Sequence, residues 1–249
     1  MAISFIGSAE ASAANGATTT VTLPLGMTQD DLILVAYAIG DNDSVDFVMT
    51  MTTAGYTKVV DIRADDTQDV DMGVFWKIMG ATTETTAMCG GLGGADAAVA
   101  AVVMVFRGVD TGTPMDVSPT TAIASGSSSP NPPSIDHGNP SGVWTVIAGA
   151  SGHTLAGAGT YTFPTGYTTN AIDRGQDDTS DVTVGIGYNI APADPEDPAV
   201  MTHSGANSTT FAWCAATMAL RPAVAATGQP AMARMSGTQF CRPALGRMN

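Results

Sequence analysis

Hydrophobic and polar residues alternate along much of this chain with the period of two that is typical of a β-strand. The alternation is clearest between residues 70 and 78, where one face carries Val70, Met72, Val74, Trp76 and Ile78. Residues 32–39 instead form a nearly continuous apolar run, bounded by acidic and glycine-containing segments. The shortness of this run and its β-branched and aromatic residues indicate a core strand rather than a helix.

Further strands are predicted where short apolar stretches are bounded by Gly, Pro, Asn or Asp. Residues 98–106 are rich in alanine, which favours a helix. Their valine-rich end and their likeness to the stretch FAWCAATMAL at 211–220 favour a strand instead. The remaining predicted strands are 2–6, 18–23, 47–52 and 56–62 in the first half of the chain, and 143–150, 167–173, 181–190 and 210–220 in the second.

The chain contains an internal repeat at an offset of 111 to 114 residues. Residues 55–79 match residues 166–191: both begin with Gly-Tyr-Thr, and both contain the pattern Asp-Asp-Thr-x-Asp-Val. The likeness extends outward, since LILVAY at 32–37 parallels VWTVIA at 143–148, and VMVFR at 103–107 parallels TMALR at 217–221. Two copies are too few for a solenoid, so we expect two related halves within a β-rich body.

These patterns predict an all-β protein, an antiparallel β-sandwich of jelly-roll type with the internal pseudo-repeat. A tandem pair of small sandwiches is the alternative. The predicted body is 1–221, made of halves 1–110 and 142–221 that are joined by the Pro-, Ser- and Gly-rich segment 111–141. Residues 222–249 lack the alternation and form a predicted extended C-terminal tail.

Charge is distributed unevenly between the body and the tail. The whole chain has a net charge of -14, but residues 1–221 hold 6 basic and 23 acidic residues, giving -17, and the last 28 residues carry +3. An acidic body argues against nucleic acid as a partner, because a phosphate backbone requires clustered Lys and Arg. The negative net charge can also be interpreted without any partner, because it keeps the protein soluble.

Several function classes have no support in the sequence. The chain has no nucleophile elbow, phosphate-binding glycine loop or zinc-protease motif, and the three histidines (His137, His153 and His203) stand apart in turn-rich sequence. The three cysteines lack metal-site spacing. The longest apolar run, 97–106, is too short to span a membrane, and the first residues do not resemble a signal peptide. We therefore expect a non-enzymatic protein without a cofactor, folded in the cytoplasm.

Two aspartate-rich loops offer the oxygen ligands that calcium prefers, although neither has the glycine and terminal glutamate of an EF-hand loop. Because the second loop recurs in both halves, a hairpin turn capped by Asp and Thr side chains is the simpler interpretation. The weak calcium candidates are Asp41, Asp43, Asp46, Asp65, Asp66 and Asp69.

The tail combines scattered large apolar residues with arginines and has no acidic residue. Such a peptide cannot build a core alone. It suits docking on a partner surface, with apolar side chains in pockets and guanidinium groups on carboxylates. A loosely packed terminus is the alternative. The candidate partner-binding residues are Met232, Arg234, Met235, Phe240, Arg242, Leu245 and Arg247.

Taken together, the opening SFIGSAEASAANGATTTVTLPLGMTQDDLILVAYAIGD, the Gly-Tyr-Thr turn, VMVFRGVDTGTPMDV, FAWCAATMALRPA and the Met-Ser-Gly-containing tail resemble a recurring kind of tailed-bacteriophage virion protein. The resemblance covers nearly the whole chain. It implies a non-enzymatic β-sandwich subunit of the virion, assembled in the host cytoplasm, that contacts other virion proteins of the capsid or tail and forms oligomers, typically homotrimers.

Two functions follow as expectations from this resemblance. The first is a capsid decoration or head-fibre subunit that is anchored to the particle by its C-terminal tail. The alternative is a tail-fibre or baseplate module that binds a host-surface glycan. A receptor-binding module needs an aromatic platform beside polar loops, and a decoration protein needs none. A glycan hydrolase is a third and weaker alternative, because paired carboxylates across an aromatic cleft are not evident.

Overall fold

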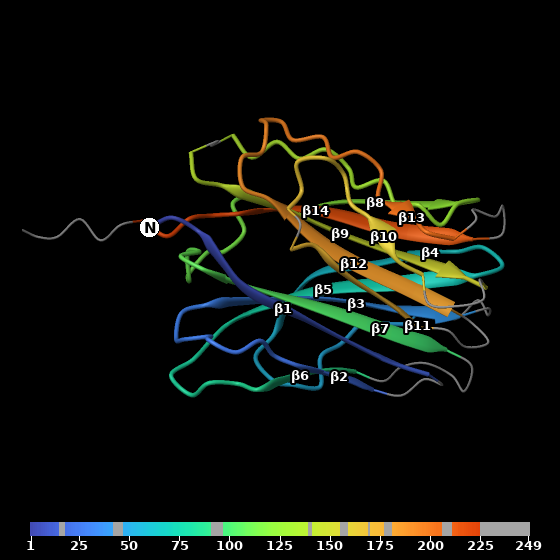
Figure 1. The fold of residues 1–249 in the computed structure, drawn as a ribbon, viewed down its shortest axis with the longest axis horizontal. Helices are drawn as coiled ribbons and strands as arrows, with labels where there is room; N and C mark the ends of the chain where they lie inside the picture. The colour runs from blue at the N-terminus through green and yellow to red at the C-terminus, as the bar shows by residue number, and fades with distance from the viewer. Residues whose placement is uncertain are drawn as a thin grey trace, which may run out of the picture.

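The computed structural model describes residues 1–14, 18–41, 47–90, 97–138, 141–154, 159–168, 170–176, 181–205 and 211–224. Over these ranges the protein is all-β, and two five-stranded antiparallel sheets pack face to face (Figure 1). The predicted all-β sandwich is thus confirmed. No helix in the described part of the chain is long and apolar enough to cross a membrane.

Each half of the chain builds one of the two large sheets. The first sheet has the order β1 (Ser4–Ala13), β7 (Ala98–Arg107), β3 (Leu32–Asp41), β5 (Asp69–Ile78) and β4 (Thr57–Ala64). The second, in the corresponding order, is β8 (Thr120–Ser125), β14 (Ala212–Leu220), β9 (Trp144–His153), β12 (Asp181–Asn189) and β11 (Ile172–Gln176). Strands at equal positions in the two sheets are related by the repeat.

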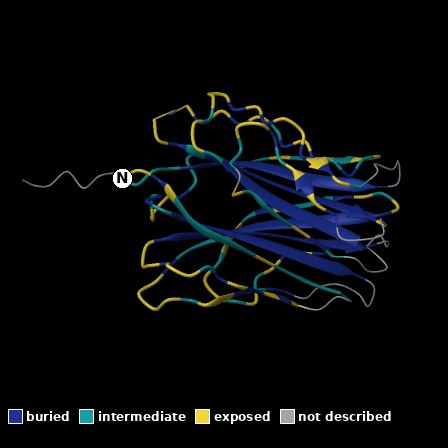
Figure 2. Ribbon diagram, in the orientation of Figure 1, coloured by how far each residue is buried: buried dark blue, intermediate teal, exposed yellow. Residues whose placement is uncertain are grey.

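Two small sheets also contribute to the fold, β2 (Thr19–Thr22) with β6 (Thr86–Cys89) and β10 (Tyr161–Thr162) with β13 (Thr202–His203). Apolar clusters lie between the large sheets and also on the other face of each large sheet. The central strands of the two large sheets are therefore buried on both faces (Figure 2). This explains why residues 32–39 form a continuous apolar run.

This strand order differs from the jelly-roll expectation. In a jelly roll the Greek keys interleave between the two sheets, whereas here the main strands of each half stay within one sheet. The physical reason is that each half has strands with two apolar faces, so it forms a complete sheet that needs cover on both sides. The alternative, two tandem sandwiches, also differs, because the main core lies between the halves.

Two reciprocal close contacts relate the halves by an approximate two-fold axis. A Cβ added to Gly40 would lie 2.6 Å from the carbonyl oxygen of Asp181, and one added to Gly152 would lie 2.3 Å from that of Asp69. Gly40 and Gly152 are 112 positions apart, as are Asp69 and Asp181. At this end of the sandwich, called the narrow end below, only glycine allows the two sheets to approach.

Core side chains become larger toward the opposite end, called the wide end below. From the wide end to the narrow end, β3 presents Leu32, Leu34, Ala36, Ala38 and Gly40, while β14 presents Leu220, Met218, Ala216, Cys214 and Ala212. Because protein cores are close-packed, such a gradient in side-chain volume requires the sheets to diverge. The sandwich core is therefore tapered.

Most predicted strands are present, and the alanine-rich stretch 98–106 is indeed a strand. Two details of the sequence interpretation were wrong. Residues 47–52 contribute one isolated bridge, at Met51, instead of a strand. The segment 111–141, expected to be loop, contains the edge strand β8, whose residues are alternately exposed and half-buried beside β14. Everything from residue 225 onward lies outside the described residues.

Candidate functional site: an aromatic pocket at the wide end

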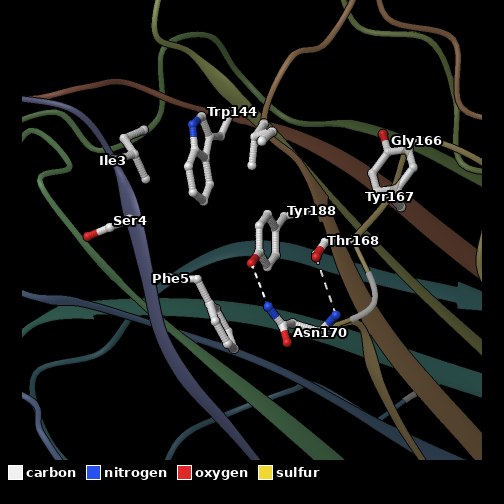
Figure 3. A pocket seen from close by; sticks show the side chains of 10 residues that line it. Ile3, Ser4, Phe5, Trp144, Gly166, Tyr167, Thr168, Asn170 and Tyr188 are labelled. Atoms are coloured by element: carbon white, nitrogen blue, oxygen red, sulfur yellow. Dashed lines mark hydrogen bonds between the residues drawn. The ribbon is translucent and has the colours of Figure 1, made fainter.

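A pocket of about 710 Å³ opens at the wide end between β1 and β12 (Figure 3). It lies at the N-terminal end of β1 and the C-terminal end of β12, where the tapered core is broadest. None of its lining residues is charged; they are Ile3, Ser4, Phe5, Trp144, Gly166, Tyr167, Thr168, Asn170, Tyr188 and Ile190.

Three aromatic rings form a stack along one side of this pocket. Phe5 and Tyr188 stack with ring centroids 5.2 Å apart, and Tyr188 and Trp144 are nearly parallel at 5.1 Å. The ring of Phe106 meets Tyr188 edge-on from the core. Offset stacking and edge contacts are the favoured geometries for such rings. Tyr188 is buried within the stack, while Phe5 and Trp144 remain partly exposed to solvent.

Local backbone features hold these rings in place. The register of β1 shifts between Phe5 and Gly7, and a bulge of this kind redirects a side chain relative to a regular strand. On the other wall, Gly166 has φ +96°, which a turn can use and most L-residues avoid. The turn is closed by a hydrogen bond of 3.2 Å from the Tyr167 amide to the Pro164 carbonyl, and the Thr168 amide joins it to β12 through the Tyr188 carbonyl at 2.9 Å.

Polar groups lie beside the stack. The Asn170 side chain donates a hydrogen bond of 3.1 Å to the Tyr188 hydroxyl, and Asn170 and Ser4 line the pocket. The Tyr167 hydroxyl lies 3.3 Å from a carboxylate oxygen of Glu196. Burial raises the pKa of Tyr167 above its usual value. An aromatic surface with a few polar groups at its edge is the arrangement that binds the apolar face and hydroxyl rim of a sugar ring.

The calcium candidates that the structure describes lie at the narrow end of the sandwich. Arg63 pairs there with Asp65 and, at 3.1 Å, with Asp69. Asp69 also accepts the Asp66 amide at 2.6 Å, and Asp66 accepts the Thr67 amide at 2.7 Å. These carboxylates therefore cap the hairpin backbone and neutralise a guanidinium group.

Asp41 is buried beside Asp69 in the register of β3 and β5. Among the described residues there is no group of three or more metal-type side chains placed to hold an ion. The candidates Asp43 and Asp46 lie outside the described residues.

The sequence suggested that all three histidines are isolated, but two of them lie together in the structure. His153 and His203 lie with ring centroids 4.8 Å apart, and the Thr183 hydroxyl joins them, 2.8 Å from one Nε2 and 3.1 Å from the other. The Gly205 amide donates to His203 Nδ1 at 3.1 Å, so neutral His203 carries its proton on Nε2 and donates to Thr183. Thr183 then donates to His153, whose Nδ1 lies 3.7 Å from Asp181.

This chain of aspartate, histidine and hydroxyl has the order found in hydrolases, but it is closed to substrate. A Cβ on Gly159 would lie only 1.9 Å from His203 Nε2, so the backbone at this glycine covers the cluster. Burial lowers the pKa of His153 to about 3 and that of His203 to about 4. Both rings are therefore neutral at pH 7, and the cluster acts as a buried structural network.

The candidate partner-binding residues of the tail, Met232, Arg234, Met235, Phe240, Arg242, Leu245 and Arg247, lie outside the described residues. The point from which the tail departs is described. Arg221 pairs with Asp116 at 2.9 Å, the Ala223 amide donates to the Gly108 carbonyl at 2.8 Å, and the N-terminal amine contacts the Ala223 carbonyl. The tail therefore leaves the body beside the N-terminus, at the wide end.

Fold and site together define a two-sheet β-sandwich protein with an uncharged aromatic pocket. Comparison with protein-family models, with curated proteins and with solved structures finds no match to this chain. Its function must therefore be argued from its own residues.

Proposed function

We propose that the protein is a non-enzymatic carbohydrate-binding module of a tailed-phage particle, of the tail-fibre or baseplate kind that binds a host-surface glycan. The observation that carries this proposal is the ring stack of Phe5, Tyr188 and Trp144 beside the polar side chains of Ser4 and Asn170. This combination is the platform that a receptor-binding module requires and that a decoration protein does not.

The charge of the site supports a neutral glycan. No charged residue lines the pocket, and the chain as a whole carries -14. A sialylated or phosphorylated sugar would have to approach a negatively charged body without a basic side chain in the pocket to pair with it. A neutral hexose needs only the apolar ring face and a few hydrogen-bonding partners.

Replacing Trp144 with alanine is expected to weaken glycan binding about tenfold or more, equivalent to about 1.4 kcal/mol, because a stacking surface is removed. The measurement is a glycan array followed by titration with methyl glycosides of glucose, galactose and mannose. Asn170→Ala, a loop change that leaves the ring stack intact, should weaken the same binding. Leu25→Ser is the control, since Leu25 is 95% exposed and lies outside the pocket. A full-length protein that binds none of these sugars would overturn the proposal.

A second candidate function, capsid decoration or head-fibre attachment, is favoured by a different observation. The body is acidic and the tail is basic, and the last described contacts of the body fix where the tail begins. A basic, apolar peptide starting from a fixed point could anchor the body to an acidic groove on the capsid or on a neighbouring subunit. A homotrimer would present three such anchors.

Truncation after Val224 tests the anchoring function. Residues 222–224 are retained because Ala223 and Pro222 pair with the body at Gly108 and Val109. Full-length protein is expected to co-sediment with purified undecorated phage heads, less so at high salt, while the truncated form stays in solution. Replacing Arg234, Arg242 and Arg247 with glutamine gives a full-length control that removes only the tail charge. Equal sedimentation of full-length and truncated protein would exclude the tail as the anchor.

A further inference from the structure

A second pocket, of about 520 Å³, lies between β4, β5 and the loop that precedes β8. We propose that this pocket, which contains Trp76, is a second carbohydrate site, so that one chain binds two sugar residues at once. The inference rests on the proposed function of the first pocket and extends it to the other edge of the sandwich.

The two pockets are related by the internal repeat. Trp76 and Tyr188 differ by 112 in residue number, and so do Met115 and Ile3, and Asp116 and Ser4. The approximate two-fold axis, which exchanges the contacts of the narrow end, also exchanges these two places. Trp76 pairs with Leu34 near the start of β3, as Tyr188 pairs with Val146 near the start of β9. Both pockets therefore open at the wide end, on opposite edges.

An aromatic side chain occupies the repeat-related position in both pockets, although its surroundings differ. In the first pocket, Tyr188 is covered on both faces by Phe5 and Trp144. Trp76 is partly exposed and packs against the core, and no aromatic ring among the described residues stacks on it. Trp76 can therefore itself serve as the platform on which a sugar ring stacks, with Val59 and Met115 completing the apolar wall.

The polar rim of the second pocket is held in advance of binding. Asp110 accepts the amides of Gly112 and Thr113 at 2.8 and 3.0 Å, which fixes the start of the lining loop. Arg221 binds the Thr113 hydroxyl at 2.9 Å and neutralises Asp116. A loop fixed before binding loses little conformational entropy when a ligand binds. The carboxylate of Asp116 is compensated, so this rim also suits a neutral sugar.

Bivalency has a functional consequence for a protein that meets a surface of repeated glycans. Two linked sites raise the effective concentration of the second sugar, and avidity can exceed single-site affinity by about 100-fold or more. Loss of either pocket would then weaken surface binding far more than binding of a free sugar.

The test uses the indole N–H signals of the full-length protein in ¹⁵N–¹H correlation spectra. The chain has three tryptophans, and the third, Trp213, is buried in β14 and lines neither pocket. Each signal is assigned by a single Trp→Phe variant. On titration with methyl glycosides of glucose, galactose and mannose, we expect the Trp76 and Trp144 signals to shift and the Trp213 signal to stay.

The two proposals fail in different ways in this experiment. A shift of the Trp144 signal alone, with one sugar bound per chain, would overturn the second site and leave the first. No shift of either signal would overturn both. Trp76→Ala is expected to reduce the stoichiometry from two sugars to one and to weaken binding to a glycan-coated surface at least about tenfold. Leu25→Ser, at an exposed position outside both pockets, should retain two sites.

Discussion

Gly152→Ala is expected to destabilise the protein by about 3 kcal/mol, which lowers the melting temperature by roughly 6 to 12 °C. The added Cβ would lie 2.3 Å from the carbonyl oxygen of Asp69 and 3.0 Å from its carbonyl carbon. Both are backbone atoms of the facing sheet, so no side chain can rotate away, and the sheets themselves must separate. Thermal unfolding followed by circular dichroism measures the effect.

Two further glycine variants make this prediction specific. Gly40→Ala meets the equivalent obstruction, the carbonyl oxygen of Asp181 at 2.6 Å, and should lower stability in the same way. Gly80→Ala is the matched control, because nothing lies within 4 Å of a Cβ at that position. If Gly152→Ala unfolds at the same temperature as Gly80→Ala, the two sheets do not approach each other at the narrow end as closely as described.

Acidification below pH 6.5 is expected to destabilise the protein through His153 and His203. Their pKa values fall from the ordinary 6.5 to about 3 and about 4 in the folded state, because both rings are buried. Below pH 6.5 the unfolded chain therefore binds more protons than the folded one. Each histidine then removes up to about 1.4 kcal/mol of stability per pH unit, until the pH reaches its folded pKa. Above pH 6.5 this contribution to stability is fully present.

Besides burial, the direction of one hydrogen bond opposes protonation of His203. His203 Nδ1 accepts the Gly205 amide, so a proton there would face another donor. Asp181 faces His153 and would partly compensate its charge, while Tyr161 lies against His203. Asp69 and Asp173 have the opposite effect on the pH dependence of stability. Burial raises their pKa values, so these two groups favour the folded state as the pH falls.

A comparison of variants therefore separates the contribution of the two histidines to stability from that of the other ionisable groups. The double variant His153→Gln/His203→Gln should be less stable at pH 7, yet lose much less stability between pH 7 and pH 4.5 than the natural chain. Urea unfolding at each pH gives both numbers. If the two proteins show the same pH dependence, the loss comes from other groups.

Much of the fold could be predicted from the sequence because strands leave a local signal. The alternation at 70–78 and the apolar run at 32–39 both fall within strands of the structure, and the repeat identified the two halves. The pattern did not identify the sheet to which each strand belongs. Continuous apolar runs indicate burial on both faces, and this evidence against a jelly roll was present in residues 32–39.

Contacts between distant residues explain the rest of what was missed. His153 and His203 are 50 positions apart, and only the packing of β13 against the end of β9 brings their rings together. The aromatic pocket joins Phe5, Trp144 and Tyr188, which belong to three strands and two sheets. Its one local signal was the Gly-Tyr-Thr turn, which the sequence marked as a repeat and not as the wall of a pocket.

The taper of the core gives the molecule a polarity that constrains how it can be mounted. Its wide end carries the N-terminus, the start of the tail and both pockets. A subunit seated on a particle by this end would turn its pockets inward, away from any host. To present them outward, the 25 residues from 225 to 249, which span at most about 90 Å when extended, would have to run back past the narrow end. The two proposed functions, attachment by the wide end and sugar binding, would therefore compete for the same face.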